Sequence, residues 1–138
     1  MPNTQKLEWD EKYSVGVAEI DTQHRQLFDA INALLDAIET NSAEEKLKDI
    51  IDTILNYKKF HFETEEKYFK EFNYPEAEEH IRKHREFSDQ IDALSQKYPK
   101  PNIEFAFALI DFLEDWLIDH LQTMDQKYVA CFKEHGLK

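Results

Sequence analysis

Histidines and carboxylates recur at helical spacing along this chain. His61 and Glu65 are four residues apart, and so are His80 and His84. Residues four apart are neighbours on the surface of a helix, so each pair presents two side chains to one point. Imidazole nitrogens and carboxylate oxygens that converge in this way are donors for a transition-metal ion. The spacing therefore predicts metal chemistry inside a helical protein.

Seven such side chains fall on stripes that are otherwise apolar. A lone inward histidine is more often a hydrogen-bonded structural residue than a metal ligand. A buried carboxylate, however, must be paired, protonated or bound to a metal, and no lysine or arginine shares these stripes. One shared metal centre is simpler than seven separate partners. The candidate metal ligands are His24, His61, Glu65, His80, His84, His120 and Asp125.

The composition of this donor set indicates two metal ions. Five imidazoles and two carboxylates exceed a tetrahedral zinc site, and the single cysteine, Cys131, cannot form a thiolate cluster. Two octahedral ions offer about twelve positions, of which five imidazoles, two bridging carboxylates and a bridging oxo or hydroxo group would fill about eleven. One position is then left for an external ligand.

The spacing between His120 and Asp125 does not fit a regular α-helix. Five residues advance an α-helix by about 500°, so the two side chains would point about 140° apart. A locally widened turn of the π type would bring them back to one face. We therefore predict such a turn between these two residues.

Helices are the elements that must position these groups. Two glycines and four prolines are too few to punctuate a many-stranded sheet. Apolar residues step by three and four in four segments, which predicts helices over 21–40, 42–73, 75–98 and 102–135. Their short connections force each helix back along the one before it. The predicted fold is one all-α domain over 1–138, an antiparallel up-down-up-down four-helix bundle (20–135) preceded by an N-terminal arm (1–19).

Three local signals mark the predicted helix boundaries. Ser42 and Glu45 have the spacing of a capping box, in which each side chain bonds the backbone N–H of the other residue. Pro75 suits the first turn of the third helix. Asn102 is placed to cap the fourth helix.

Charge and hydropathy exclude several classes of function. The 17 basic and 29 acidic residues leave a net charge of −12, which repels a nucleic-acid backbone. The most apolar stretch, 105–121, carries four acidic residues, and the N-terminus lacks the apolar core of a signal peptide. We expect a soluble cytoplasmic protein that neither binds nucleic acid nor inserts into a membrane.

Together these motifs resemble the hemerythrin family, specifically the single-domain bacteriohemerythrins. The likeness covers nearly the whole chain and is carried by Trp9 and by segments 15–24, 61–66, 80–84 and 116–128. It implies a non-haem di-iron centre with a bridging oxo or hydroxo group. In that assignment one iron is held by His80, His84 and His120, the other by His24 and His61, and both irons are bridged by Glu65 and Asp125.

The resemblance also implies a function, which is reversible dioxygen binding at the iron with two imidazoles. The protein would then be an oxygen carrier, store or sensor and not an enzyme, serving an oxygen-consuming protein or a sensor partner. An apolar pocket would exclude water from the bound gas. The residues implied for this pocket are Leu27, Phe62, Trp116 and Leu117, with Tyr128 as an outer hydrogen-bonding group.

Two other functions stay open at this point. The same centre could reduce peroxide or nitric oxide as an enzyme, or the protein could sequester iron. Di-iron oxidases of the ferritin-like kind use about four carboxylates and two histidines. The inverse ratio here favours the dioxygen carrier.

Overall fold

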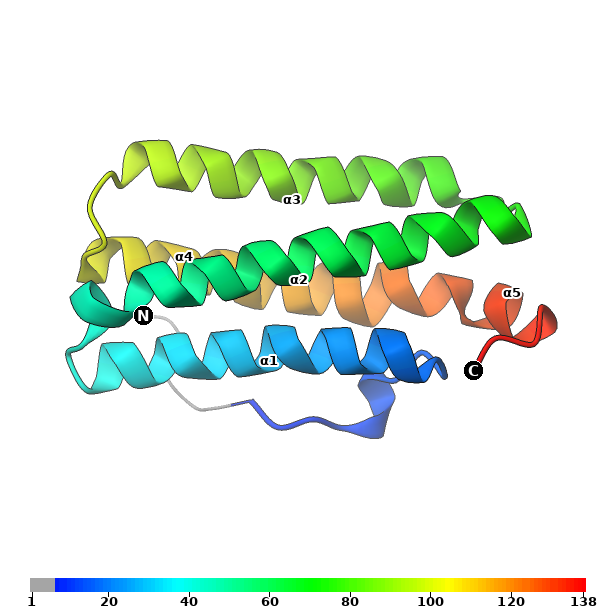
Figure 1. The fold of residues 1–138 in the computed structure, drawn as a ribbon, viewed down its shortest axis with the longest axis horizontal. Helices are drawn as coiled ribbons and strands as arrows, with labels where there is room; N and C mark the ends of the chain where they lie inside the picture. The colour runs from blue at the N-terminus through cyan, green and yellow to red at the C-terminus, as the bar shows by residue number, and fades with distance from the viewer. Residues whose placement is uncertain (1–6) are drawn as a thin grey trace.

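The computed structural model describes the backbone of residues 7–138 and the side chains of 7–116 and 120–138. Its four long helices are α1 (Ala18–Glu39), α2 (Ala43–Phe72), α3 (Ala77–Lys97) and α4 (Ile103–Trp116), and no strand occurs in the described chain. The helices lie side by side, and each runs opposite to its predecessor (Figure 1). The predicted all-α, up-down-up-down bundle is confirmed.

The fourth helix changes its winding after Trp116. It continues as a π-helical segment, Leu117–Met124, then as a short 3-10 turn, Asp125–Tyr128, and ends in α5 (Val129–Glu134). The widened turn predicted between His120 and Asp125 is therefore confirmed.

The N-terminal arm lies along α1 (Figure 1). Leu7 exchanges two hydrogen bonds with the side chain of Asn32, at 2.7 and 2.9 Å, and the ring of Tyr13 packs edge-on against Phe28. α1 already begins at Ala18, so the arm ends two residues before the predicted boundary. Residues 1–6 of the predicted arm lie outside the described residues.

The helix boundaries follow some of the predicted local signals. Asn102 caps α4, because its Oδ1 accepts from the backbone N–H of Phe105 at 3.0 Å. α2 ends in the left-handed Asn73 (φ 51°), a conformation that asparagine tolerates better than most residues. Pro75 lies in the turn before α3, which starts two residues later, so its predicted place in the first turn is wrong.

The predicted capping box at the start of α2 is also wrong. Ser42 makes no side-chain cap bond, and the N–H of Glu45 donates instead to the backbone carbonyl of Ser42 at 3.2 Å. With φ −118° and ψ 18°, Ser42 is not in the extended conformation that aims a cap side chain at the helix. Its hydroxyl lies 2.7 Å from that of Thr40.

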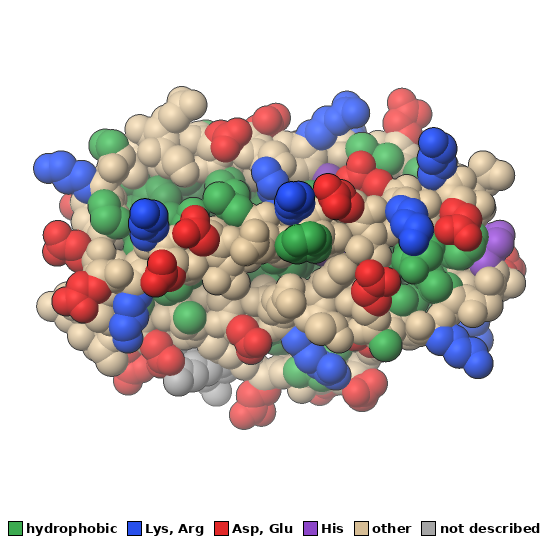
Figure 2. All heavy atoms as spheres, in the orientation of Figure 1, with side chains coloured by type: hydrophobic (Ala, Val, Ile, Leu, Met, Phe, Trp, Pro, Cys, Tyr) green, Lys and Arg blue, Asp and Glu red, His purple; other side chains and the backbone are tan. Residues whose placement is uncertain are grey.

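The apolar interior is divided into two clusters. The larger one fills most of the bundle and includes Leu27, Leu34 and Ile54, whereas the smaller one, at the end near α5, includes Phe69 and Phe132. On the face shown in Figure 2, acidic and basic side chains are interspersed and apolar patches are small. Within the described chain, no helix has the length and apolar character needed to cross a membrane.

Candidate metal centre

All seven candidate ligands are buried in the middle of the bundle. Each of these residues is at most 3% exposed. They come from every layer of the fold: α1 supplies one, α2 two, α3 two and the fourth helix two. The order along the chain is His24, His61, Glu65, His80, His84, His120 and Asp125.

The seven side chains form two overlapping groups. Glu65 with His80, His84 and His120 makes one group. The other contains Glu65 and Asp125 with two histidines, His24 and His61. In each group one nitrogen or oxygen atom per residue lies within 4.8 Å of all the others. An ion with six ligands at about 2.1 Å keeps its donor atoms roughly 3 to 4.2 Å apart, so each group has nearly the dimensions of a coordination sphere.

Asp125 faces both sets of histidines. Its Oδ1 lies 2.8 Å from Nε2 of His80 and 3.0 Å from Nε2 of His120. Its Oδ2 lies 2.9 Å from Nε2 of His24 and 3.5 Å from Nε2 of His61. One carboxylate oxygen is therefore directed at each set, which is the arrangement of a bridging ligand.

Glu65 also lies between the two sets. Its Oε1 is 2.9 Å from Nε2 of His84, 3.1 Å from Nε2 of His61 and 3.5 Å from Nε2 of His80. Its other oxygen, Oε2, is buried without a hydrogen-bond partner among the described residues. This free oxygen gives Glu65 a second donor at the same centre.

The hydrogen bonding of the cluster is incomplete in the way that a metal site requires. Both ring nitrogens of His80 and of His120, as well as Oδ1 of Asp125, are buried without a properly aligned partner in the described structure. Buried polar atoms are otherwise nearly always hydrogen-bonded. These atoms lie close to one another but are directed at common points and not at one another. The residues present therefore fit two metal ions better than a hydrogen-bonded core.

The electrostatics of the cluster lead to the same conclusion. Burial opposes protonation of His61 and His80, but the carboxylates of Glu65 and Asp125 outweigh it, and the pKa rises to about 9 for His61 and about 10 for His80. Burial likewise opposes ionisation of both carboxylic acids, yet the surrounding imidazoles hold the pKa of each well below its usual range. Two anions thus need positive charge in this cavity, from protons or from metal.

The two remaining shifted histidines behave differently. Burial lowers the pKa of His120, and burial together with the neighbouring His61 lowers the pKa of His24. Their neutral imidazoles carry the lone pairs that a metal ion needs.

Two residues that the sequence pattern did not single out position the imidazoles. Gln23 Oε1 accepts from Nδ1 of His61 at 2.9 Å, and its amide nitrogen donates to Thr64 at 3.0 Å. Glu66 Oε2 lies 2.9 Å from Nδ1 of His84. Each contact turns Nε2 of the imidazole toward the centre. Because Gln23 and Glu66 are sequence neighbours of ligands, they do not share the ligands' helix face, and spacing alone could not reveal them.

Large apolar side chains cover the imidazoles on one side. The ring of Phe62 stacks on His84 at 3.8 Å, and the indole of Trp116 stacks on His120 at 3.9 Å. Leu27 is completely buried, one turn after His24 on α1. The side chain of Leu117, the fourth residue of the predicted pocket, lies outside the described residues.

Two buried tyrosines lie close to the carboxylates. Burial and Asp125 raise the pKa of Tyr57 well above its usual value, and burial and Glu65 do the same for Tyr128. Both phenols therefore keep their protons at neutral pH. The hydroxyl of Tyr128 makes no hydrogen bond of ordinary geometry among the described residues, but the carboxylate of Glu65 is the acceptor that it faces, which agrees with the outer hydrogen-bonding role predicted for it.

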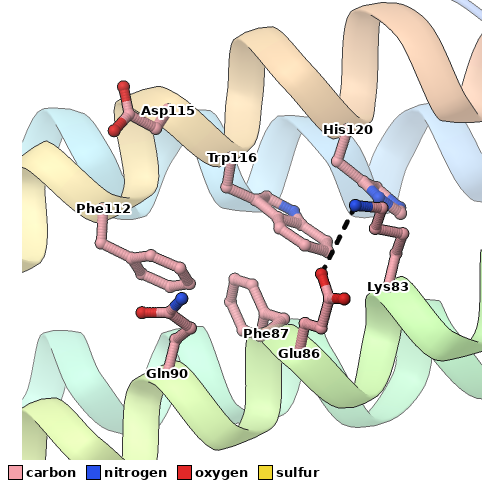
Figure 3. Close-up of a pocket in the computed structure, with 8 residues that line it drawn as sticks. All are labelled: Lys83, Glu86, Phe87, Gln90, Phe112, Asp115, Trp116 and His120. Atoms are coloured by element: carbon pink, nitrogen blue, oxygen red, sulfur yellow. Dashed lines mark ion pairs between the residues drawn. The ribbon is translucent and has the colours of Figure 1, made fainter.

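A groove of about 580 Å³ between α3 and α4 leads from the surface to His120. Figure 3 shows Phe87, Phe112 and Trp116 facing one another across this groove, with an ion pair between Lys83 and Glu86 at 3.5 Å beside them. Small molecules thus have a partly apolar approach to one edge of the centre.

Comparisons with known proteins agree with this geometry. The family model described as "Hemerythrin HHE cation binding domain" matches residues 15–132. A hemerythrin-like protein of Naegleria gruberi is 34% identical over 87% of this chain and 88% of its own length. The bacteriohemerythrin of Methylococcus capsulatus is 27% identical (87% and 91% covered), and the myohemerythrin of Sipunculus nudus is 28% identical (87% and 88% covered).

Proposed function

The chain belongs to the hemerythrin family, and on this premise we propose that it binds dioxygen reversibly at a non-haem di-iron centre, as an oxygen carrier, store or sensor rather than as an enzyme. The observation that carries this proposal is the buried cluster in which two carboxylates each face two sets of histidines. Two ferrous ions, when bound, supply the two electrons and the open coordination position that reversible dioxygen binding requires.

We assign the ligands to the two irons as the resemblance to the family implied. His80, His84 and His120 would hold one iron, His24 and His61 would hold the other, and Glu65 and Asp125 would bridge them. The coordination position left for an external ligand would then lie at the iron with two imidazoles. Phe62 and Trp116 stack on His84 and His120, and Leu27 is buried one turn after His24, so apolar surface that excludes water and free protons lies beside the imidazoles of both proposed irons.

The ligand assignment is tested by counting metals. His61→Ala is expected to reduce the iron content from two ions per chain to one, because the second iron loses half of its imidazoles. His135→Ala is the matched control, since His135 is an exposed histidine near the C-terminus and is expected to keep both ions. Two ions per chain in His61→Ala would contradict the assignment.

The function is tested by cycling oxygen. Ferrous protein prepared without air is expected to develop a visible absorption band on exposure to oxygen, to lose it under vacuum, and to repeat this over many cycles. Conversion to a ferric form during the first exposure would contradict reversible binding and would favour the alternative, an enzyme that reduces peroxide or nitric oxide. The observation that favours this alternative is the pair of buried phenols, Tyr57 and Tyr128, which could supply protons.

A further inference from the structure

Tyr57 is a polar side chain beside the centre that neither the ligand assignment nor the predicted apolar pocket uses. It lies on α2 one turn before His61 and is 1% exposed. Its ring stacks on the imidazole of His61, with centroids 5.1 Å apart and planes 16° apart. A phenol in this position is held against a histidine that we assign to the iron with the free coordination position.

The hydroxyl of Tyr57 is only half satisfied. It accepts a hydrogen bond from the indole N–H of Trp116 at 3.4 Å, which is longer than most N–H···O hydrogen bonds. In the described structure, its own O–H donates no hydrogen bond. A buried donor without an acceptor is costly, so the structure holds an O–H group that a bound molecule could satisfy.

The surroundings of Tyr57 place this donor at the ligand pocket. Its ring contacts that of Phe62 at 6.1 Å, and its hydroxyl meets Trp116, which also lines the groove in Figure 3. Phe62 and Trp116 are the two aromatic residues of the predicted apolar pocket. The N–H of Trp116 already occupies one lone pair of the oxygen, which fixes the phenol and leaves its hydrogen as the free group.

We propose that Tyr57 donates a hydrogen bond to the small molecule bound at the metal of His24 and His61, and thereby determines which ligands are retained. This proposal rests on the proposed function. A donor at this place favours ligands that carry negative charge or an acceptor atom beyond the metal-bound atom, such as reduced dioxygen or azide. Ligands without such an acceptor gain nothing from it.

The test uses Tyr57→Phe, which removes the hydroxyl and keeps the ring. Azide is the probe, because its binding to the diferric protein can be followed by absorption whether or not the protein binds oxygen reversibly. The dissociation constant for azide is expected to rise about tenfold, the effect of losing one hydrogen bond to a charged ligand. The dissociation rate of oxygen from the ferrous protein is expected to rise by a similar factor.

Tyr74→Phe is the matched control. Tyr74 is also a buried tyrosine, but its hydroxyl donates to Glu76 at 3.3 Å, away from the pocket, so its removal is expected to change azide affinity less than twofold. Iron content and the unfolding temperature of the metal-free protein are measured for both variants, which separates a binding effect from a folding defect. If Tyr57→Phe keeps two irons and binds azide as tightly as the Tyr74→Phe protein does, the proposal is overturned. Failure of oxygen cycling with a normal azide response would overturn only the proposed function.

Discussion

The backbone N–H of Asp125 donates to the carbonyl of His120, five residues earlier. This bond is a π-helical turn, and it brings both side chains to the same side of the fourth helix, where Asp125 Oδ1 lies 3.0 Å from Nε2 of His120. In an α-helix the same bond would join residues four apart. The segment therefore contains one residue more than the geometry of the site needs.

A deletion should remove this extra residue without dismantling the centre. Thr123 is an exposed residue between His120 and Asp125. Without it, the two ligands would be four residues apart, and an ordinary α-helix would place them on one face. The deletion variant is expected to bind two metal ions per chain, as measured by metal analysis after dialysis.

Deletion of Asp115 is the control for that experiment. Asp115 is exposed in the regular part of α4, so its loss turns everything after it by about 100° relative to the preceding turns. This variant is expected to lose the metal. If both deletions abolish metal binding, the π-helical segment does not act as an added residue.

Sequence spacing predicted the ligand-bearing helix faces but not the contacts between distant segments. The inward stripes followed from steps of three and four, and the awkward spacing of His120 and Asp125 indicated the widened turn. The hydrogen bond between Tyr57 and Trp116 joins residues 59 positions apart, and no periodicity within one helix can reveal it.

Local capping was predictable only where the backbone conformation allowed it. Asn102 caps α4 as its position indicated. The hydroxyl of Ser42 has an alternative partner in Thr40, and the tight turn through Asn41 (φ 55°) gives Ser42 a ψ of 18°. A short side chain that can bond several neighbours does not fix the geometry of its own turn.

Glu66 is expected to strengthen the metal site through His84. Its carboxylate fixes the ring of His84 and increases the basicity of the coordinating nitrogen. Loss of such a partner typically weakens metal affinity 10–100-fold, and Glu66→Ala is expected to weaken it by about that factor. Glu66→Gln retains a hydrogen-bonding group without the charge and is expected to lose less. Competition with a chelator measures both.

Glu63→Ala controls for the loss of one negative charge from the same helix. Glu63 is exposed and is expected to leave the metal affinity within about twofold, since exposed charges are screened by salt. Equal losses in Glu63→Ala and Glu66→Ala would mean that the effect comes from net charge and not from His84.

The metal-free protein is expected to lose stability as the pH rises from 6.5 to 9. His61 and His80 have folded pKa values of about 9 and about 10, above the unfolded value of 6.5, so their contribution is complete below pH 6.5 and is lost as they deprotonate. His24 and His120, whose folded pKa values are lowered, act in the opposite direction close to pH 6.5, where the unfolded state still binds protons, and add no slope above about pH 7.5, where they are neutral in both states. Unfolding temperatures at pH 6.5, 7.5 and 9 measure the effect.

Metal loading should reverse this dependence on pH. The imidazoles of His61 and His80 must give up their protons to bind an ion, so metal affinity rises between pH 6.5 and 9. His80→Asn in the metal-free protein is expected to flatten the slope in part. An unfolding temperature that is constant from pH 6.5 to 9 in the unaltered metal-free protein would show that these imidazoles are not held in their protonated form.

The apolar cover of the centre is expected to control the rate at which the ferrous protein oxidises irreversibly. Leu27→Ala opens a cavity one turn from His24, so water can approach the irons, and oxidation in air should become several-fold faster. Leu34→Ala is the matched control, because Leu34 is equally buried on α1 but two turns further from the centre. Each substitution is expected to cost about 2–5 kcal/mol of unfolding free energy. If both variants lose stability but only Leu27→Ala oxidises faster, the apolar surface that protects the irons lies at the site. If both variants oxidise at the same rate, a general loosening of the bundle is the cause.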